Sequence, residues 1–120
     1  MSKYFKEAEF LRCTPPCHET DMDKDFLSLL DRIRERAGIP MVMNCAYRSP
    51  EWEKSKGRSG KGDHPQGKGV DIKAPDSTTR MRIVSACIIE GVTRIGIGKT
   101  YVHIGTGNGL PQGVMWDYYE

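Results

Sequence analysis

The apolar positions in residues 23–37 recur at steps of three and four, which predicts a helix with one apolar face. These positions are Phe26, Leu27, Leu30 and Ile33. Asp21 or Asp23 can cap the start of this helix, and Gly38 stands where a glycine commonly ends one. The other positions are mostly charged, so we expect that face to be exposed to water.

A second helix is predicted from a cap at Asp76 or Ser77 to about Glu90, with Gly91 closing it. Its buried side is expected to comprise Met81, Ile83, Val84, Ala86, Cys87 and Ile88. Strands are predicted at 39–47, 70–74, 93–98, 100–104 and 113–119, whereas the polar residues 48–69 are predicted to form a long loop. Helices and strands mix without strict alternation, which favours an α+β fold: one small domain over residues 1–120, with an antiparallel sheet and two main helices.

Composition narrows the function classes. The 120 residues suit one domain, and a net charge of +2 is too weak to indicate nucleic acid by itself. No apolar run approaches the roughly 20 residues that a membrane span needs. The start, "MSKYFKEAEF", lacks the apolar segment of a secretory signal, so we expect the protein to be made in the cytoplasm. We also expect it to be a monomer.

Four cysteines bear on redox state and metal binding. Cys45 and Cys87 lie in apolar runs and are expected to be buried thiols. Cys13 and Cys17, in "CTPPC", are expected to form a local disulfide or to stay as two free thiols. A structural zinc at "CTPPCH" is less favoured, because no second close pair of Cys or His follows.

The glycine-rich segments do not indicate a nucleotide site. "GIGKT" lacks the glycine that a phosphate-binding loop needs at position 93, and a predicted strand follows it instead of a helix. The basic run in residues 54–62 could contact phosphates, but stacking aromatics are not interleaved with it. Nucleic-acid binding is therefore the weakest hypothesis, and it predicts steeply salt-dependent binding.

His64, Asp71 and His103 form a candidate metal site. Asp71 alternates with Val70 and Ile72 on one predicted strand, and His103 alternates in the same way on another. If these strands are neighbours, Asp71 and His103 project from one sheet face, and the loop can bring His64 over them. Two imidazoles and one carboxylate suit a divalent transition ion, with Zn²⁺ the most natural, and leave a fourth position open for water.

Three ordered motifs resemble a zinc peptidase family. "HPQGKGVD" resembles the S-x-H-x-x-G-x-A-x-D signature of the D-Ala-D-Ala carboxypeptidases, D-Ala-D-Ala dipeptidases and L-Ala-D-Glu endolysins. "AYRSPEW" and "YVHIGTG" resemble the upstream Y-R-S/T-P segment and the strand that carries the last zinc histidine. The resemblance covers nearly the whole chain, and it is greatest to the small carboxypeptidase-like domain of phages and of bacterial genomes that carry them.

The resemblance implies a hedgehog/D-Ala-D-Ala peptidase-like fold and a zinc peptidase that hydrolyses peptidoglycan stem peptides, as a carboxypeptidase or an endopeptidase. It implies that His64, Asp71 and His103 bind zinc. It also implies that Arg48 orients a substrate carboxylate, with Ser49 and Tyr101 beside the substrate. Action on the cell wall would follow release from the cell or occur as part of a phage particle.

The chain departs from the family pattern at four positions. Gly62 and Gly69 replace the serine and alanine of the signature, and Gly105 stands where an aspartate often follows the last histidine. Thr100 occupies the position of the usual general base, and a threonine cannot take a proton near neutral pH. Asp63 and Glu90 are the candidate replacements, and Asp63 is favoured because it adjoins His64. These departures support an alternative function: a catalytically impaired, metal-containing module that binds the cell wall or has a structural role.

Overall fold

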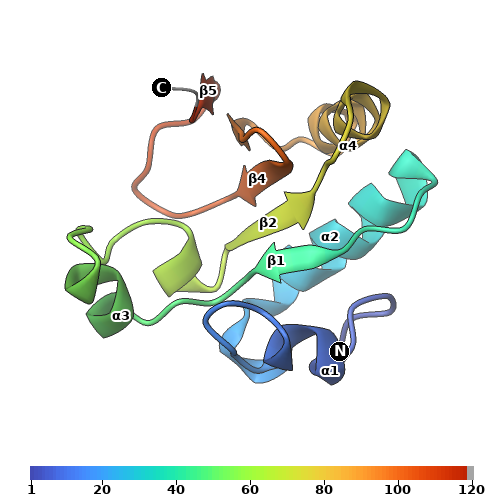
Figure 1. Cartoon of the computed structure of the whole chain (residues 1–120). Coiled ribbons are helices and arrows are strands. Elements are labelled where there is room, and N and C mark those ends of the chain that lie inside the picture. Colours follow the sequence, from blue (N-terminus) through green and yellow to red (C-terminus); the bar gives the residue numbers. More distant parts are fainter. Residues whose placement is uncertain (119–120) are drawn as a thin grey trace.

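The computed structural model describes residues 1–118, in which five strands form one sheet in the order β1-β2-β4-β3-β5 (Figure 1). The strands are β1 (Met43–Cys45), β2 (Gly69–Lys73), β3 (Arg94–Ile97), β4 (Tyr101–Gly105) and β5 (Val114–Asp117). The pairs β1–β2, β2–β4 and β3–β4 are antiparallel, whereas β5 runs parallel to β3. The α+β prediction is confirmed, with a mostly antiparallel sheet rather than a wholly antiparallel one.

The two main predicted helices are present, with the expected caps. They are α2 (Lys24–Ala37) and α4 (Ser77–Ile89). The Asp23 side chain accepts a hydrogen bond from the Phe26 N–H at 2.9 Å, and Asp76 accepts one from the Thr79 N–H at 2.7 Å. Gly38 ends α2 with φ 68°, a backbone conformation that glycine adopts at little cost.

One hydrophobic core joins these helices to the central strands. Figure 1 shows α2 running along the sheet beside β1 and β2. The core includes fully buried side chains of α2, β2 and β4, namely Phe26, Leu30, Ile33, Val70, Ile72, Val102 and Ile104. Because side chains alternate along a strand, the residues between these positions on β2 and β4 point to the other face of the sheet.

The polar loop predicted at 48–69 contains structure that periodicity did not indicate. It holds the helix α3 (Pro50–Ser55) and the 3-10 turn η2 (His64–Gln66). Ser49 caps α3 by accepting a hydrogen bond from the Trp52 N–H at 3.0 Å, and Pro50 lies in its first turn, where a missing N–H costs nothing. A helix of 6 residues is too short to display an apolar face, so its cap was the one usable signal.

Two further predictions were wrong in detail. The first strand extends only over Met43–Cys45, not over 39–47. On α4, Met81 and Ile88 are 67% and 57% exposed, so they do not belong to its buried side. The apolar residues of α4 are spread around the helix, and only Ile83, Ala86 and Cys87 are buried.

The N-terminal segment packs beside β1. It contains the short helix α1 (Glu7–Leu11) and the 3-10 turn η1 (Glu19–Asp21). The Thr14 N–H donates to the Asn44 carbonyl at 3.1 Å, which partly covers the outer edge of the sheet. Cys13 and Cys17 are buried free thiols, so of the two favoured states the structure has the unbonded one. None of the helices in residues 1–118 combines the length and hydropathy that crossing a bilayer requires.

Candidate metal centre

Asp71 and His103 face each other across neighbouring strands. They are paired in the register of β2 and β4, and both side chains lie on the sheet face opposite the helices. Nδ1 of His103 lies 2.9 Å from Oδ1 of Asp71. The condition set by the sequence, that these two strands be neighbours, is therefore met.

His64 reaches the same point from η2. This turn ends at Gly67, whose φ of 69° lets the chain reverse into β2. Nε2 of His64 lies 3.5 Å from the same Asp71 oxygen, and the centroids of the two imidazole rings are 5.0 Å apart. His64 and His103, from η2 and β4, thus both approach the carboxylate of Asp71 on β2.

Hydrogen bonds orient both imidazole rings. Nδ1 of His64 lies 2.5 Å from the Ala46 carbonyl oxygen, and Nε2 of His103 lies 2.8 Å from Oδ2 of Asp63. The Ala46 carbonyl only accepts hydrogen bonds, so Nδ1 of His64 carries a proton, and in the neutral ring its Nε2 directs a lone pair towards Asp71. Both nitrogens of His103 face carboxylates, at 2.8 and 2.9 Å, so each donates a hydrogen bond when the ring is protonated.

The donor atoms of this arrangement are of the kinds that bind a divalent metal ion. A ring lone pair and a carboxylate oxygen repel one another unless a cation or a proton lies between them. Ligands about 2.0–2.2 Å from a tetrahedral zinc lie about 3.3–3.6 Å from each other; the His64–Asp71 distance of 3.5 Å lies in this range, and the His103–Asp71 distance of 2.9 Å is shorter. Ring nitrogens fixed from behind by a carbonyl and a carboxylate are also typical of zinc histidines.

The electrostatics of the centre also favour a cation. Burial acts against ionisation of Asp71, but hydrogen bonds with His103 and His64 outweigh it and hold the pKa of Asp71 well below its usual range. Burial lowers the pKa of His103, but Asp63 and Asp71 outweigh this effect and raise it. Two ionised carboxylates thus flank His103 in a buried setting, and positive charge there is stabilised.

Asp63 lies behind His103, on the side away from Asp71. Besides His103, its carboxylate accepts hydrogen bonds from the Arg94 guanidinium, the shortest at 2.9 Å, and from the Gly107 N–H at 2.8 Å. Burial opposes ionisation, but these bonds hold the pKa of Asp63 well below its usual range. The sequence suggested Asp63 as a general base, and a carboxylate with these contacts and this pKa is poorly suited to take a proton.

Arg48 lies at the centre with a restricted side chain. Its Nε is 3.4 Å from Oε1 of Glu53, which in turn pairs with Arg58 at 2.9 Å. Its guanidinium also lies over the Trp52 ring, 5.6 Å from the centroid. Arg48 therefore pairs with the buried Glu53, which faces the centre.

Of the remaining residues singled out in the sequence, one lines the centre and two do not. Tyr101 lines it, with its ring 5.5 Å from that of Tyr118. Ser49 caps α3 and does not line either hollow described below. Glu90 pairs with Arg32 and Arg36 on the helical side, at 3.2 and 2.7 Å, so it is not placed to act as the base.

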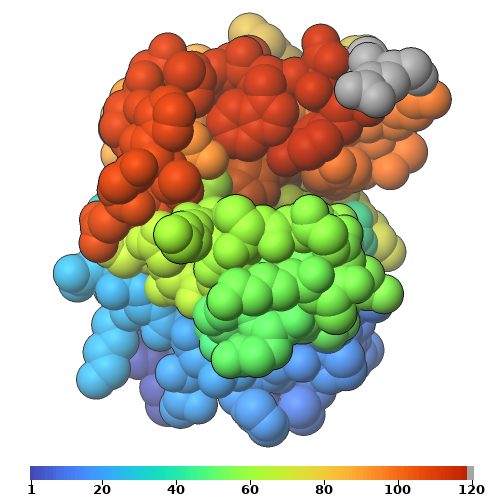
Figure 2. Space-filling view, turned by 90° about the vertical axis from the view of Figure 1, so that its left-hand side faces the viewer, coloured from blue at the N-terminus to red at the C-terminus, as the bar shows by residue number. Residues whose placement is uncertain are grey.

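Two adjoining hollows meet at Asp71. The first, termed the centre hollow, has a volume of about 330 Å³ and is lined by Arg48, Glu53, Arg58, Gly62, Asp63, His64, Asp71, Arg94, Tyr101, His103, Trp116 and Tyr118. Figure 2 shows its two walls, the green segment that carries α3 and η2 and the orange-red segment after β3. The second, termed the edge groove, has a volume of about 830 Å³ and shares Arg48, Asp71 and Tyr101 with the first.

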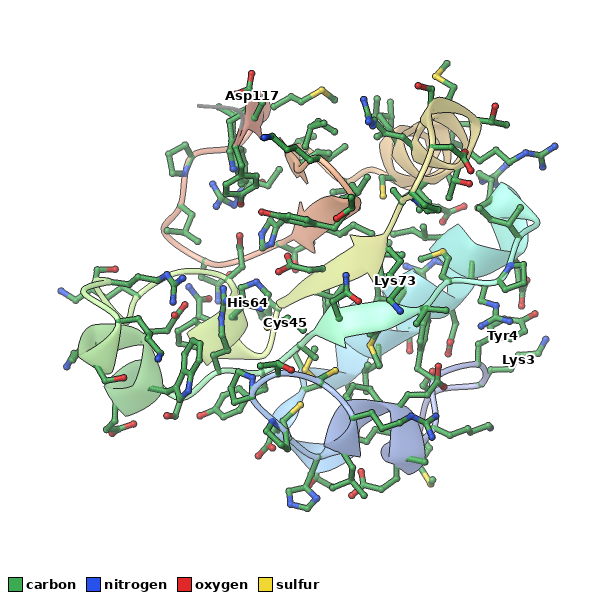
Figure 3. The ribbon with its side chains drawn as sticks, viewed as in Figure 1. Lys3, Tyr4, Cys45, His64, Lys73 and Asp117 are labelled. Carbon is green, nitrogen blue, oxygen red and sulfur yellow. The ribbon has the colours of Figure 1, made fainter. Side chains whose placement is uncertain are left out.

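Sequence reasoning missed a thiol at this centre. Cys45 Sγ lies 3.9 Å from Nδ1 of His64, and Figure 3 shows the two residues side by side. Cys45, His64 and Asp71 offer ligand atoms that all lie within 4.8 Å of one another. Burial raises the pKa of the Cys45 thiol to about 12. The strand prediction at 39–47 correctly included Cys45, but nothing in the sequence indicated that it pairs with Asp71.

A model of the Peptidase M15 family matches residues 3–105 of the chain. The chain belongs to peptidase family M15. This M15 chain carries His64, Asp71 and His103 inside the matched range, whereas Trp116 and Tyr118 of the centre hollow lie beyond it. No curated protein matches the chain. Members of family M15 are metallopeptidases, so membership and geometry together indicate a metal-dependent peptidase.

Proposed function

We propose that this protein is a zinc-dependent peptidase that hydrolyses peptidoglycan stem peptides, at a bond involving a D-amino acid. The observation that carries the proposal is the convergence of His64, Asp71 and His103 where two hollows meet. A carboxypeptidase or an L-Ala-D-Glu endopeptidase would both suit this arrangement. Its place of action would be the cell wall, after release from the cell or within a phage particle.

Three residues would hold the ion, and two further groups would hold those residues. His64 would bind through Nε2, His103 through Nδ1 and Asp71 through its carboxylate. The Ala46 carbonyl and Asp63 keep the opposite ring nitrogens protonated. Bound zinc would supply Lewis acidity and bring the pKa of a water ligand to roughly 7.

Arg48 would bind a substrate carboxylate. Its ion pair with Glu53 and its position over Trp52 restrict the guanidinium, and its side chain is only 16% exposed. A fixed guanidinium forms paired hydrogen bonds with a carboxylate, and stem peptides end in one. Tyr101 lines both hollows and would contact the chain on either side of the scissile bond.

The edge groove suits an acidic peptide. Arg12, Arg48 and Lys73 line it, against Glu9 and Asp71. Since Asp71 is assigned to the ion, the groove presents net positive charge. Stem peptides carry carboxylates along their length as well as at the end, so an extended strand of such a peptide complements this surface.

The rate is expected to be modest. The acids that line the centre hollow within residues 1–118 are Glu53, Asp63 and Asp71, and each is already engaged by arginine or histidine. Thr100 cannot replace them. A positioned base is typically worth about 10²–10⁴-fold in rate, and that factor would be absent.

The proposal is tested with purified, zinc-loaded protein and defined muropeptides, measuring zinc content and product release together. We expect about one zinc per chain and slow hydrolysis that a chelator abolishes. His103→Ala should lose both, and Arg48→Lys should keep the zinc but lose much of kcat/KM, because an ammonium cannot form the paired hydrogen bonds. Folded, zinc-loaded protein that cleaves no stem peptide would contradict the proposal.

A second candidate function is a non-catalytic module that binds the cell wall, and Cys45 favours it. A thiolate from Cys45 would add a fourth protein ligand and close the coordination shell, as in structural zinc sites. Cobalt-substituted protein would then show a thiolate charge-transfer band that Cys45→Ser removes. Sedimentation with purified sacculi, without cleavage, would support this function over peptidase activity.

A further inference from the structure

The carboxylate of Asp63 occupies a space that exists because three neighbouring residues are glycines. A Cβ built on Gly105 would overlap the Asp63 carboxylate, and one built on Gly107 would lie 2.6 Å from its Oδ1. A Cβ on Gly69 would lie 2.6 Å from the Cβ of Asp63. Real Cβ atoms do not approach other atoms this closely, so a side chain at any of these positions would displace Asp63.

Gly69, Gly105 and Gly107 thus form a cradle around Asp63, which is only 4% exposed. The buried carboxylate is nevertheless fully engaged in hydrogen bonds. Its oxygens accept from His103 Nε2, from the Gly107 N–H and from the Arg94 guanidinium at two nitrogens. Arg94 is itself fixed, since it donates to the Pro111 carbonyl at 2.9 Å and stacks over Trp116 at 5.0 Å from the centroid. A buried charge is tolerated when it is paired and hydrogen-bonded in this way.

These contacts support His103 as a ligand through Nδ1. With a cation at Nδ1, the one proton of the neutral ring would lie on Nε2, where Asp63 accepts it and holds the ring in place. Without that acceptor, the ring could turn or change its protonated nitrogen, and Nδ1 would no longer be held towards the ion.

An aspartate at position 105 could place its carboxylate in the space that the Asp63 carboxylate occupies. It lies two residues after His103 on β4, so its side chain would project from the same sheet face as the imidazole. Gly105 is not among the glycines with positive φ, so its backbone accepts any residue type. The three atoms nearest to a Cβ at this position all belong to the Asp63 carboxylate.

We propose that Asp63, neutralised by Arg94, is the positioning residue for His103, and that Asp63 and position 105 are exchangeable sources of one carboxylate. The inference rests on the metal role given to His103 under the proposed function. It does not require that the protein be catalytic.

The test is a carboxylate exchange, read out as zinc affinity by chelator competition and as the visible spectrum of cobalt-loaded protein. Asp63→Gly should lower zinc affinity by about 10–100-fold, the usual effect of losing such a partner. Asp63→Asn keeps an acceptor oxygen but loses the charge, so it should lower zinc affinity by less than Asp63→Gly does. Asp63→Gly combined with Gly105→Asp should recover most of the affinity and the wild-type cobalt spectrum.

Gly105→Asp alone serves as the matched control, because it adds a second carboxylate to an occupied space and should lower thermal stability. Arg94→Gln should weaken zinc binding in the same direction as Asp63→Asn but less, and it remains informative if the Asp63 variants do not fold. Unchanged affinity in Asp63→Gly, or a double variant no better than Asp63→Gly, would overturn the inference. If His103→Ala retains full zinc affinity, the assignment of ligands fails instead, and absence of peptidase activity alone leaves the exchange result intact.

Discussion

The face of β2 and β4 that contacts the helices carries only aliphatic side chains, whereas the opposite face carries Asp71 and His103 one position along each strand. The helical face holds four fully buried side chains, which stabilise the fold through the apolar area that they remove from water. They are Val70, Ile72, Val102 and Ile104. On the other face, each group depends on particular partners at hydrogen-bond distance. The same two strands therefore hold the fold together on one side and position the candidate ligands on the other.

The largest expected effect comes from the helical face. Ile104→Ala removes a fully buried side chain and should lower the free energy of unfolding by about 2–5 kcal/mol, measured by urea denaturation. The folded fraction should still bind zinc, because the ligands lie on the other face. Met81→Ala, at a position 67% exposed, is the control and should change stability little. A loss in Ile104→Ala no larger than in this control would contradict the division between the two faces.

The second-largest effect is expected on the face opposite the helices, where a substitution should weaken zinc binding and leave the fold stable. Asp71→Asn keeps the shape but removes the charged ligand, so zinc affinity should fall by more than the roughly 10–100-fold typical of a supporting contact. Titration calorimetry and zinc content measure this loss, and the urea midpoint of the metal-free protein reports the fold. Asp76→Asn makes the same chemical change at the cap of α4, where asparagine caps as well as aspartate, and should leave zinc binding unchanged. Equal zinc affinity in the two variants would remove Asp71 from the site.

The smallest effect is the response of the metal-free protein to acid. The pKa values of Asp63 and Asp71 are held below the usual aspartate value, so their stabilising contribution is present above the pKa of the unfolded chain and is lost as pH falls through the folded pKa. The free energy of unfolding should therefore decrease on acidification below about pH 4. Asp63→Asn should show a shallower decrease in urea denaturation with a chelator present. An identical slope in both proteins would mean that Asp63 is not ionised in its cradle.

Much of the fold was predictable because its signals are local. The apolar period of residues 23–37 and the caps at Asp23 and Asp76 gave α2 and α4 almost to the residue. The alternation around Asp71 and His103 placed both side chains opposite the core. The wrong predictions also have physical reasons. Helix α3 is too short to show a period of apolar residues, and Met81 and Ile88 are apolar but exposed.

The candidate site was predictable in part. His64, Asp71 and His103 were selected by residue type and by family motifs, and the structure brings them together. Cys45 and the true contacts of Asp63 were not accessible, since a buried thiol and an acid beside a histidine have no distinguishing local pattern. The roles of these residues stay predictions until metal binding is measured.

By itself, the sequence determined the two main helices, the order of the strands along the chain and the side of β2 and β4 that faces the core, because these follow from periodicity and capping within a few residues. Only the tertiary structure decided that β5 runs parallel to β3, that Asp63 supports His103 from 40 positions away, and that Gly69, Gly105 and Gly107 enclose its carboxylate. Contacts at such separations depend on how the whole chain packs, and no local pattern of residues encodes them.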